Sequence, residues 1–252
     1  MLPCGLLDKR HRNFRIRSLG LNSIANRYSK KEIDTAAQTC RFELWPIHLR
    51  IPPYKWVFVD VGANVGDFTS AVLKLVLPEY VIAIEPLPSC HAQLKGVLKA
   101  ANNSRLVEAA AGEATGEINI RLTCNNKMSS VLSPLKDIEA CYSPGDYSVK
   151  DTLKVNQIRI DDAVPRDRQV GLLKMDVQGY ELRALRGAEA TLARTSAILI
   201  EINYVSHYDG AVGFNEVHEF LAARGFQLHG VSAPYFGNGR PLWADAIYSR
   251  CI

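Results

Sequence analysis

The sequence predicts an α/β fold: a doubly wound parallel sheet of about seven strands, with helices on both faces and an antiparallel β insertion after the third strand. Three observations lead to this fold class. A β-branched run at 57–61 is followed by a glycine-rich turn and then by apolar residues at helical spacing. Strand-like and helix-like segments alternate with short links, which implies right-handed crossovers between parallel strands. Segments 116–123 and 152–160 instead alternate with a period of two, as a half-exposed antiparallel pair does.

Length and composition favour one globular domain with an appendage. Of the 252 residues, 47% are hydrophobic and 22% are charged. We divide the chain into a basic arm and helical lead-in at 1–50 and a single domain at 51–252, with the insertion at about 113–160. No apolar run approaches the roughly 20 residues of a membrane span, and the apolar start is too short for a secretory signal. Six scattered cysteines without a CxxC pair fit reduced thiols. These features predict a cytoplasmic protein.

Positive charge concentrates in the lead-in, although the net charge of the chain is only +4. A run of this kind is usually a solvated arm, and contact with an anionic surface is the alternative. The excess charge gives no clear sign of a nucleic-acid partner. Apolar residues at helical spacing predict a helix at 31–45 that could lie over a ligand pocket. The basic residues are Lys9, Arg10, Arg12, Arg15, Arg17, Arg27, Lys30 and Lys31.

The remaining strands and helices are predicted from hydrophobic periodicity and from the turn-forming residues between them. Asp161 and Asp162 precede the fourth core strand and are typical of a turn or a helix cap. We expect strands at 57–61, 80–86, 105–112, 171–181, 197–203, 226–232 and 244–250, and helices after 66, at 89–101, up to 192 and at 214–225.

Polar residues end several of the predicted apolar strands. An open α/β sheet binds its ligands at the carboxyl ends of the strands. A buried charge without a partner is unfavourable by several kcal/mol, so carboxylates at these positions indicate a ligand site. The residues concerned are Asp60, Glu85, Asp176, Gln178 and Glu201.

The first glycine turn discriminates between two nucleotide cofactors. Glu85 follows Gly66 at about the interval at which an acid accepts hydrogen bonds from ribose hydroxyls. A dinucleotide fingerprint requires G-x-G-x-x-G, whereas here Ala-Asn-Val separates Gly62 from Gly66, and Asp60 and Asp67 flank the turn. Two acids disfavour a pyrophosphate but favour an ammonium and a sulfonium group. The turn therefore favours S-adenosylmethionine over NAD.

The segments DVGANVG, AIEP, the serines Ser129 and Ser130, LKMDVQGYE and LIEIN occur in this order and together resemble the FkbM-type family of S-adenosylmethionine-dependent methyltransferases. The resemblance covers about 57–203, and its most specific part is LKMDVQGYELRALRGAE at 173–189. It implies a class I methyltransferase fold and O-methylation of sugars or of hydroxyls on secondary metabolites. One departure is Gln178, where the family usually carries Glu, and this shifts the acid role to Asp176.

The resemblance also implies a set of cofactor-binding residues. The glycine turn would hold the methionine portion and Glu85 the ribose. Ala109 and Ala110, at the end of the third strand, would border the adenine, although their small side chains fit close helix packing equally well. The full set is Asp60, Gly62, Ala63, Asn64, Gly66, Glu85, Pro86, Ala109, Ala110, Ser129 and Ser130.

Transfer of a methyl group to a hydroxyl requires removal of a proton, to which a positioned base contributes about 10²–10⁴-fold. In a regular strand Lys174 and Asp176 share one face, which places Asp176 near the transferred methyl. Asp176 could take the proton, orient the hydroxyl or bind the amino group of the cofactor. Glu201 is a second candidate base, or it could neutralise Lys174. Lys174 could lower the pKa of the hydroxyl or pair with a deeper carboxylate. His207 is a third candidate, although a loop histidine is usually solvated.

Two further features leave alternatives open. Asp176, Glu201 and His207 could together bind a divalent metal, but their spacing does not indicate one. Aromatic residues of the C-terminal loops could stack on a sugar or lipid acceptor, or could be ordinary packing. They are Tyr204, Tyr208, Tyr235, Phe236 and Trp243.

We therefore expect an O-methyltransferase that acts on a sugar, a glycolipid or a glycosylated metabolite. One alternative activity is methylation of a nitrogen or a carboxylate, which needs no strong base. The alternative to an enzyme is a binding module that keeps the cofactor pocket and docks its basic arm on RNA or anionic lipid. Lys174, Asp176 and Glu201 count against that module, while Gln178 leaves it open.

Overall fold

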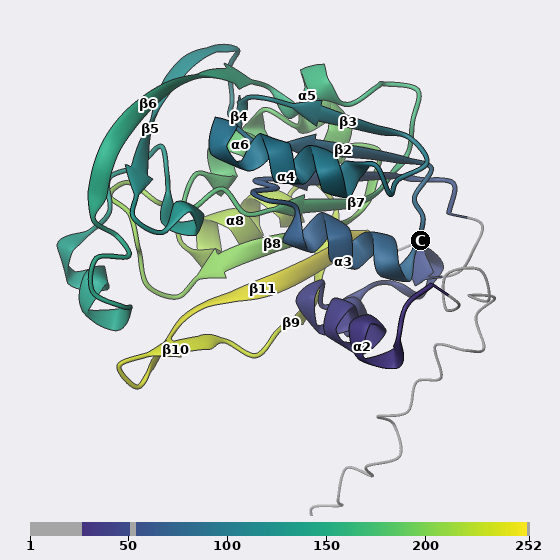
Figure 1. Cartoon of the computed structure of the whole chain (residues 1–252). Coiled ribbons are helices and arrows are strands. Elements are labelled where there is room, and N and C mark those ends of the chain that lie inside the picture. The colour runs from purple at the N-terminus through teal and green to yellow at the C-terminus, as the bar shows by residue number, and fades with distance from the viewer. Residues whose placement is uncertain (1–26, 51–53, 251–252) are drawn as a thin grey trace, which may run out of the picture.

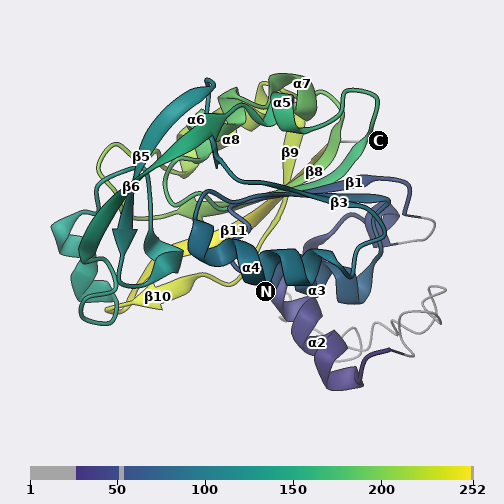
Figure 2. The same cartoon turned by 45° about the horizontal axis from the view of Figure 1, so that its top comes forward.

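The computed structural model describes residues 27–50 and 54–250. A mixed sheet lies at its centre, helices cover both faces, and a small second sheet lies at one end (Figures 1 and 2). This architecture confirms the predicted α/β class. The strands of the central sheet are β1 Val57–Val61, β2 Tyr80–Ile84, β3 Ser104–Val107, β7 Val170–Met175, β8 Thr195–Asn203, β9 Phe226–Val231, β10 Tyr235–Gly237 and β11 Arg240–Arg250.

The strand order of the central sheet creates one crevice. The order is β3-β2-β1-β7-β8-β11, and β9 and β10 both pair with β11. β1 pairs in parallel with β2 on one side and with β7 on the other. The chain thus runs outward from β1 to β3 and then returns to start again at β7. Ligands of such sheets bind beyond the carboxyl ends of the strands at this reversal.

Both faces of the sheet are buried, because the side chains of β1 alternate between two hydrophobic clusters. Val57, Val59 and Val61 pack in one cluster, and Phe58 packs in the other. A parallel strand covered on both sides needs such a continuous apolar run. In Figure 2 the two helical layers lie on opposite sides of the sheet. One layer holds α2 Lys30–Thr39, α3 Asp67–Leu75 and α4 Pro88–Leu98, and the other holds α5 Ile160–Ala163, α6 Glu181–Arg186, α7 Glu189–Leu192 and α8 Phe214–Ala222.

The insertion forms the second sheet, from β4 Ala110–Ala111, β5 Gly116–Thr123 and β6 Val149–Ile158. β5 and β6 are antiparallel, as predicted. The prediction of one strand at 105–112 is wrong, because the chain leaves the central sheet after β3. The Val107 carbonyl accepts hydrogen bonds from the N–H groups of both Glu85 and Ala109, which turns the chain, and β4 then pairs with β6.

The N-terminal helix is shorter than predicted. α2 begins with a capping box between Ser29 and Glu32 and ends at Thr39. Arg41 then adopts a left-handed conformation, with φ of 53°, and short 3₁₀ turns follow at Phe42–Leu44 and Ile47–Arg50. Most of the predicted basic arm lies outside the described residues. Within the described part of the chain, no helix combines the length and apolarity that crossing a membrane requires.

Candidate active site

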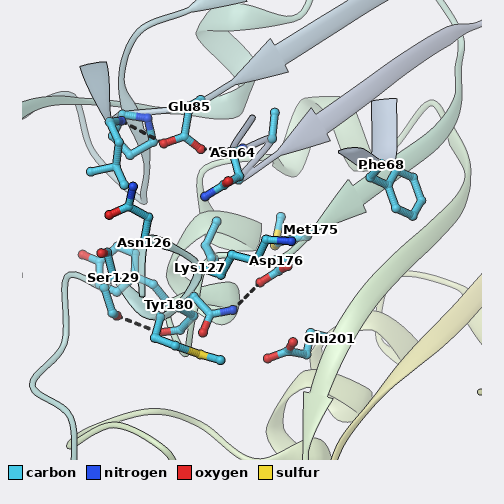
Figure 3. Close-up of a pocket in the computed structure, with 18 of the residues that line it drawn as sticks. Asn64, Phe68, Glu85, Asn126, Lys127, Ser129, Met175, Asp176, Tyr180 and Glu201 are labelled. Carbon is cyan, nitrogen blue, oxygen red and sulfur yellow. Dashed lines mark hydrogen bonds between the residues drawn. The ribbon is translucent and has the colours of Figure 1, made fainter. Parts of the chain in front are cut away.

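A cavity of about 390 Å³ opens at the carboxyl ends of β1, β2, β7 and β8. Its volume lies in the range of pockets that hold small ligands. In the view of Figure 3, Glu85 and Asn64 lie at one end, Glu201 at the other, and Asp176 between them. Segments outside the sheet contribute as well, since Arg41 follows α2 and Tyr142 and Tyr147 belong to the insertion. The site therefore combines residues that are far apart in the sequence.

The glycine turn after β1 packs tightly against the turn after β7. A Cβ atom on Gly62 would lie 1.8 Å from the Asp176 carbonyl oxygen, so only glycine fits there. The Gly62 and Ala63 N–H groups donate to the Ile84 carbonyl, which ties the turn to the end of β2. Asn64 has a φ of 49° and, with Ala63, lines the cavity. These contacts fix the cavity floor.

The Glu85 carboxylate connects two backbone segments of the cavity wall, at Asn64 and at Leu87. One carboxylate oxygen accepts the Asn64 N–H at 2.7 Å and the other accepts the Leu87 N–H at 2.8 Å. The side chain is buried, and this burial raises its pKa, although the two N–H groups act in the opposite direction. Glu85 still lines the cavity, as does Pro86. Each carboxylate oxygen has a second lone pair with which to accept a hydrogen bond from a ligand hydroxyl.

Asp60 lies below the cavity and not in its wall. Its carboxylate is fully buried, accepts a hydrogen bond from the Thr69 hydroxyl at 2.6 Å, and lies 3.3 Å from the Lys174 ammonium. Gly66 starts α3 and packs against α4. Neither residue is among those that line the cavity, and their contact with the cofactor stays a prediction.

Lys174 connects the buried carboxylate to the cavity. Its ammonium lies 3.7 Å from Asp176 and donates to the Gly62 carbonyl at 3.0 Å. Burial alone would lower the pKa of Lys174, but Asp60 and Asp176 outweigh it and hold the pKa above its ordinary value. Lys174 therefore stays charged, and its main partner is the deeper carboxylate, one of the two roles that the sequence left open.

The turn after β7 differs from the regular strand that the sequence suggested. β7 ends at Met175, and Gln178 and Gly179 have φ angles of 55° and 90°. Glu181 holds this turn, because its carboxylate accepts the N–H groups of Val177 and Gly179. Burial, and to a lesser extent Asp176, raise the pKa of Glu181 to about 7. Sequence reasoning missed this role, although Glu181 lies within the most specific segment.

Asp176 is held from two sides. Gln178 Nε2 donates to Asp176 Oδ1 at 2.6 Å, and the Lys174 ammonium faces Oδ2. The Tyr208 hydroxyl donates to Gln178 Oε1 at 2.8 Å, which fixes the orientation of the amide. With 36% of its side chain exposed, Asp176 is also accessible from the cavity. Its environment suits a fixed, ionised acceptor.

Glu201 faces the same cavity but has no such partners. It lies within β8, opposite Asp245 of β11, and its carboxyl group makes no hydrogen bond among the described residues. Burial raises the pKa of Glu201 well above its ordinary value, and Asp176, Glu181 and Asp245 raise it further. Asp245 is paired with Arg41 at 2.7 Å. These neighbours and the burial therefore shift the Glu201 carboxyl toward its protonated form.

Aromatic rings from the insertion and from the loop after β8 surround His207 at this end of the cavity. His207 is buried, its Nε2 lies 3.0 Å from the Tyr142 hydroxyl, and its ring stacks on Tyr147. Burial lowers the pKa of His207 to about 4, so the ring is neutral near pH 7. Tyr235 stacks between Tyr142 and Trp243. The expectation of a solvated histidine is thus wrong, and Tyr142 and Tyr147 are residues that sequence reasoning missed.

The other predicted residues also reach the cavity. Ala109 and Ala110 lie in its wall, at the start of the second sheet and not at the end of β3. Ser129 accepts the Thr123 N–H within the insertion, whereas Ser130 donates to the Gln178 carbonyl at 2.6 Å and so ties the insertion to the turn after β7. Asp161 accepts the Thr191 N–H and thereby caps α7, as predicted for a cap residue.

Comparisons with known proteins decide the family. The sequence model of the methyltransferase FkbM domain matches residues 60–228, which is most of the chain. The chain belongs to the FkbM methyltransferase family. This match confirms the family that the sequence resemblance indicated.

Two individual proteins illustrate the similarity. The FkbM-family chain is 26% identical over 144 residues to "Methyltransferase 1" of Beauveria bassiana, which covers 52% of this chain and 57% of that relative. The crystal structure of methyltransferase FkbM from Methylobacillus flagellatus KT has a TM-score of 0.51 at 17% identity, covering 94% of this chain and 59% of that one. The chain thus spans just over half the length of both proteins. The second similarity concerns the fold alone.

The residues present fit the cofactor that the family implies. Acidic residues outnumber basic ones among the described residues that line the cavity, which suits a ligand with a sulfonium and an ammonium group. Asn64 and Glu85 would border its polar groups, and Ala109 and Ala110 leave room for a flat ring. When bound, S-adenosylmethionine supplies the activated methyl group. No group of three or more metal-ligating side chains among the described residues could hold a metal ion, Asp176, Glu201 and His207 included.

Several cavity residues of this chain lie outside the matched range. Arg41 precedes it, and Trp243 and Asp245 follow it. All three lie at the end of the cavity that holds Glu201. Segments outside the matched range therefore contribute to the Glu201 end of the cavity.

Proposed function

We propose that this methyltransferase transfers the methyl group of S-adenosylmethionine to a hydroxyl of a sugar, in a free saccharide, a glycolipid or a glycosylated metabolite. The observation that carries the proposal is the end of the cavity beyond Asp176. There an unpartnered carboxyl, Glu201, faces a cavity that Tyr142, His207 and Trp243 also line. Sugar hydroxyls need a proton acceptor, and the apolar face of a sugar ring packs well on aromatic side chains.

The geometry divides the cavity into two halves. At the Glu85 end, the glycine turn and Glu85 would hold the methionine and ribose portions of the cofactor, with Ala109 and Ala110 beside the adenine. Asp176 lies between this end and Glu201 in the view of Figure 3. Because Lys174 and Gln178 already hold it, we assign Asp176 to orienting the reactants. Alignment of hydroxyl, methyl carbon and sulfur contributes a large part of the rate of such a transfer.

Charge also favours a neutral acceptor. Near Glu201 the cavity contains carboxyl groups and a neutral histidine, and the Arg41 guanidinium is already paired with Asp245. Among the described residues at this end of the cavity, an anionic acceptor would meet these acids without a free cation to bind it. Neutral hydroxylated rings avoid this repulsion. We also propose a cytoplasmic location, since the described cysteines are all free thiols.

A labelling experiment tests the proposal. The protein is incubated with S-adenosylmethionine labelled in its methyl group and with glycolipid and nucleotide-sugar extracts, and the labelled products are isolated. We expect the label in a sugar and resistant to mild base, as an ether is. Asp176→Ala should abolish labelling, whereas Asp137→Ala, at an exposed carboxylate of the insertion, should preserve it. Label in an amine or in a base-labile ester would contradict the proposal.

A further inference from the structure

Glu201 differs from the other carboxyl groups of the cavity in what surrounds it. Both oxygens of Glu85 accept backbone N–H groups, Asp176 is held by Gln178 and Lys174, and Asp245 is paired with Arg41. The Glu201 carboxyl makes no hydrogen bond within the described part of the chain, yet it lines the cavity. Among the described residues, no hydrogen bond or ion pair holds the Glu201 carboxyl, so a ligand in the cavity can change its ionisation.

The groups around Glu201 come from every neighbouring element and are mostly acidic or neutral. Burial and the acids around it raise its proton affinity, Lys174 opposes them, and Arg41 is paired with Asp245. Burial also makes the tyrosines harder to ionise, so they stay neutral. The groups are Lys174 and Asp176 from β7 and its turn, Glu181 from α6, Asp245 from β11, Arg41 after α2, Tyr142 and Tyr147 from the insertion, and His207 and Tyr208 after β8.

We propose that Glu201 is the catalytic base and that the charge of the cofactor controls it. Glu201 carries a proton in the free protein and releases that proton when the positively charged cofactor binds in the same cavity. The identity of the acceptor in this inference rests on the proposed function. The proton release on cofactor binding does not depend on it. Under such control, Glu201 becomes an ionised base only when the methyl donor is bound.

The transfer balances with Glu201 as the only proton acceptor. The O–H bond of the acceptor breaks as the O–CH₃ bond forms, and its proton passes to a Glu201 oxygen. The S–CH₃ bond breaks, and its electron pair stays on sulfur, which becomes neutral. Because the positive charge disappears, the carboxyl group again prefers its protonated form. The base therefore becomes stronger as the transfer proceeds.

Calorimetry measures the proton release without any acceptor. S-adenosylmethionine and S-adenosylhomocysteine, which differ in the sulfonium charge, are titrated into the protein near neutral pH in phosphate and in Tris. The dependence of the heat on the buffer gives the number of protons released. We expect up to about one more proton with the charged cofactor, a difference that Glu201→Gln removes. Glu219→Gln, at an exposed glutamate of α8, should retain it.

A second measurement uses only the unmodified protein, in case the variant does not fold. As the pH rises, the affinity for S-adenosylmethionine should increase relative to that for S-adenosylhomocysteine, by at most about tenfold per pH unit. A pH-independent ratio, equal proton release for both ligands, or a difference that survives in Glu201→Gln would overturn the inference. Proton release as expected, together with no methyl transfer to any glycan, would support the role of Glu201 in ionisation and overturn the proposed acceptor alone.

Discussion

Gln178 donates a hydrogen bond of 2.6 Å to Asp176 and accepts one of 2.8 Å from the Tyr208 hydroxyl. The amide thus links the turn after β7 to the loop after β8. A carboxyl group at this position would place two acids at hydrogen-bond distance, and one of them would have to take up a proton. The amide instead donates to Asp176 without placing a second acid beside it.

Removing this link should destabilise the protein. We expect Gln178→Leu to lower the free energy of unfolding by about 1–3 kcal/mol, because a hydrogen bond to a charged group is lost and the Tyr208 hydroxyl loses an acceptor. Urea denaturation measures the change. Gln93→Leu, at an exposed position of α4, should change stability by less than about 0.5 kcal/mol. Equal effects of both substitutions would show that the link contributes nothing.

The buried pair of Asp60 and Lys174 should be more sensitive. Lys174→Met leaves the fully buried Asp60 carboxylate with only the Thr69 hydroxyl, and we expect a loss of about 3–5 kcal/mol. Replacing both residues, in Asp60→Asn/Lys174→Met, should recover part of that loss, since no unpaired charge remains. Thermal and urea unfolding report both values. If the loss of stability in the double variant instead equalled the sum of the losses from Asp60→Asn alone and Lys174→Met alone, the two residues would not act as a pair.

Glu181 should make stability depend on pH. Its pKa is about 7 in the folded protein and 4.5 ordinarily, so between these pH values the folded state binds more protons than the unfolded state. The contribution of Glu181 is therefore complete below about pH 4.5 and is lost as the pH rises to about 7, with a slope of at most about 1.4 kcal/mol per pH unit. Unfolding curves of Glu181→Gln should lack this decline. An unchanged slope in the variant would mean that other groups cause it.

Trp243 should affect the acceptor and not the cofactor. It lines the cavity at the Glu201 end and stacks on Tyr235. We expect Trp243→Ala to raise the KM for the acceptor about tenfold, because an aromatic contact contributes on the order of 1 kcal/mol beyond the area that it buries. The Kd for S-adenosylhomocysteine should stay unchanged. A weaker Kd with an unchanged KM would reverse our assignment of the two ends.

The sequence predicts the Glu85 end of the cavity better than the Glu201 end, for a physical reason. The β-branched strand at Val57–Val61, its glycine turn and Glu85 form local patterns whose chemistry depends on few distant contacts. Arg41, Tyr142 and Asp245 meet only through tertiary packing of α2, the insertion and β11. No periodicity along the chain brings these three together.

Local backbone geometry explains the remaining differences. The predicted third strand is divided because the Val107 carbonyl accepts hydrogen bonds from two N–H groups. One belongs to Glu85, at the end of the neighbouring strand, and the other to Ala109, in the turn. Asp176 leaves the strand because the next residues adopt left-handed conformations, including the non-glycine Gln178. A non-glycine residue at such a φ has little signature in a single sequence, since tertiary contacts stabilise it.

The binding of S-adenosylmethionine at the Glu85 end of the cavity can be measured directly by titration calorimetry of the unmodified protein and of Glu85→Gln. The structure predicts that both S-adenosylmethionine and S-adenosylhomocysteine bind, and that Glu85→Gln weakens both by at least about tenfold, since one charge-assisted hydrogen bond is worth about 1.5–3 kcal/mol. No heat with either ligand, together with tight binding of NAD, would contradict the cofactor assignment. Unchanged affinity in Glu85→Gln would contradict its location.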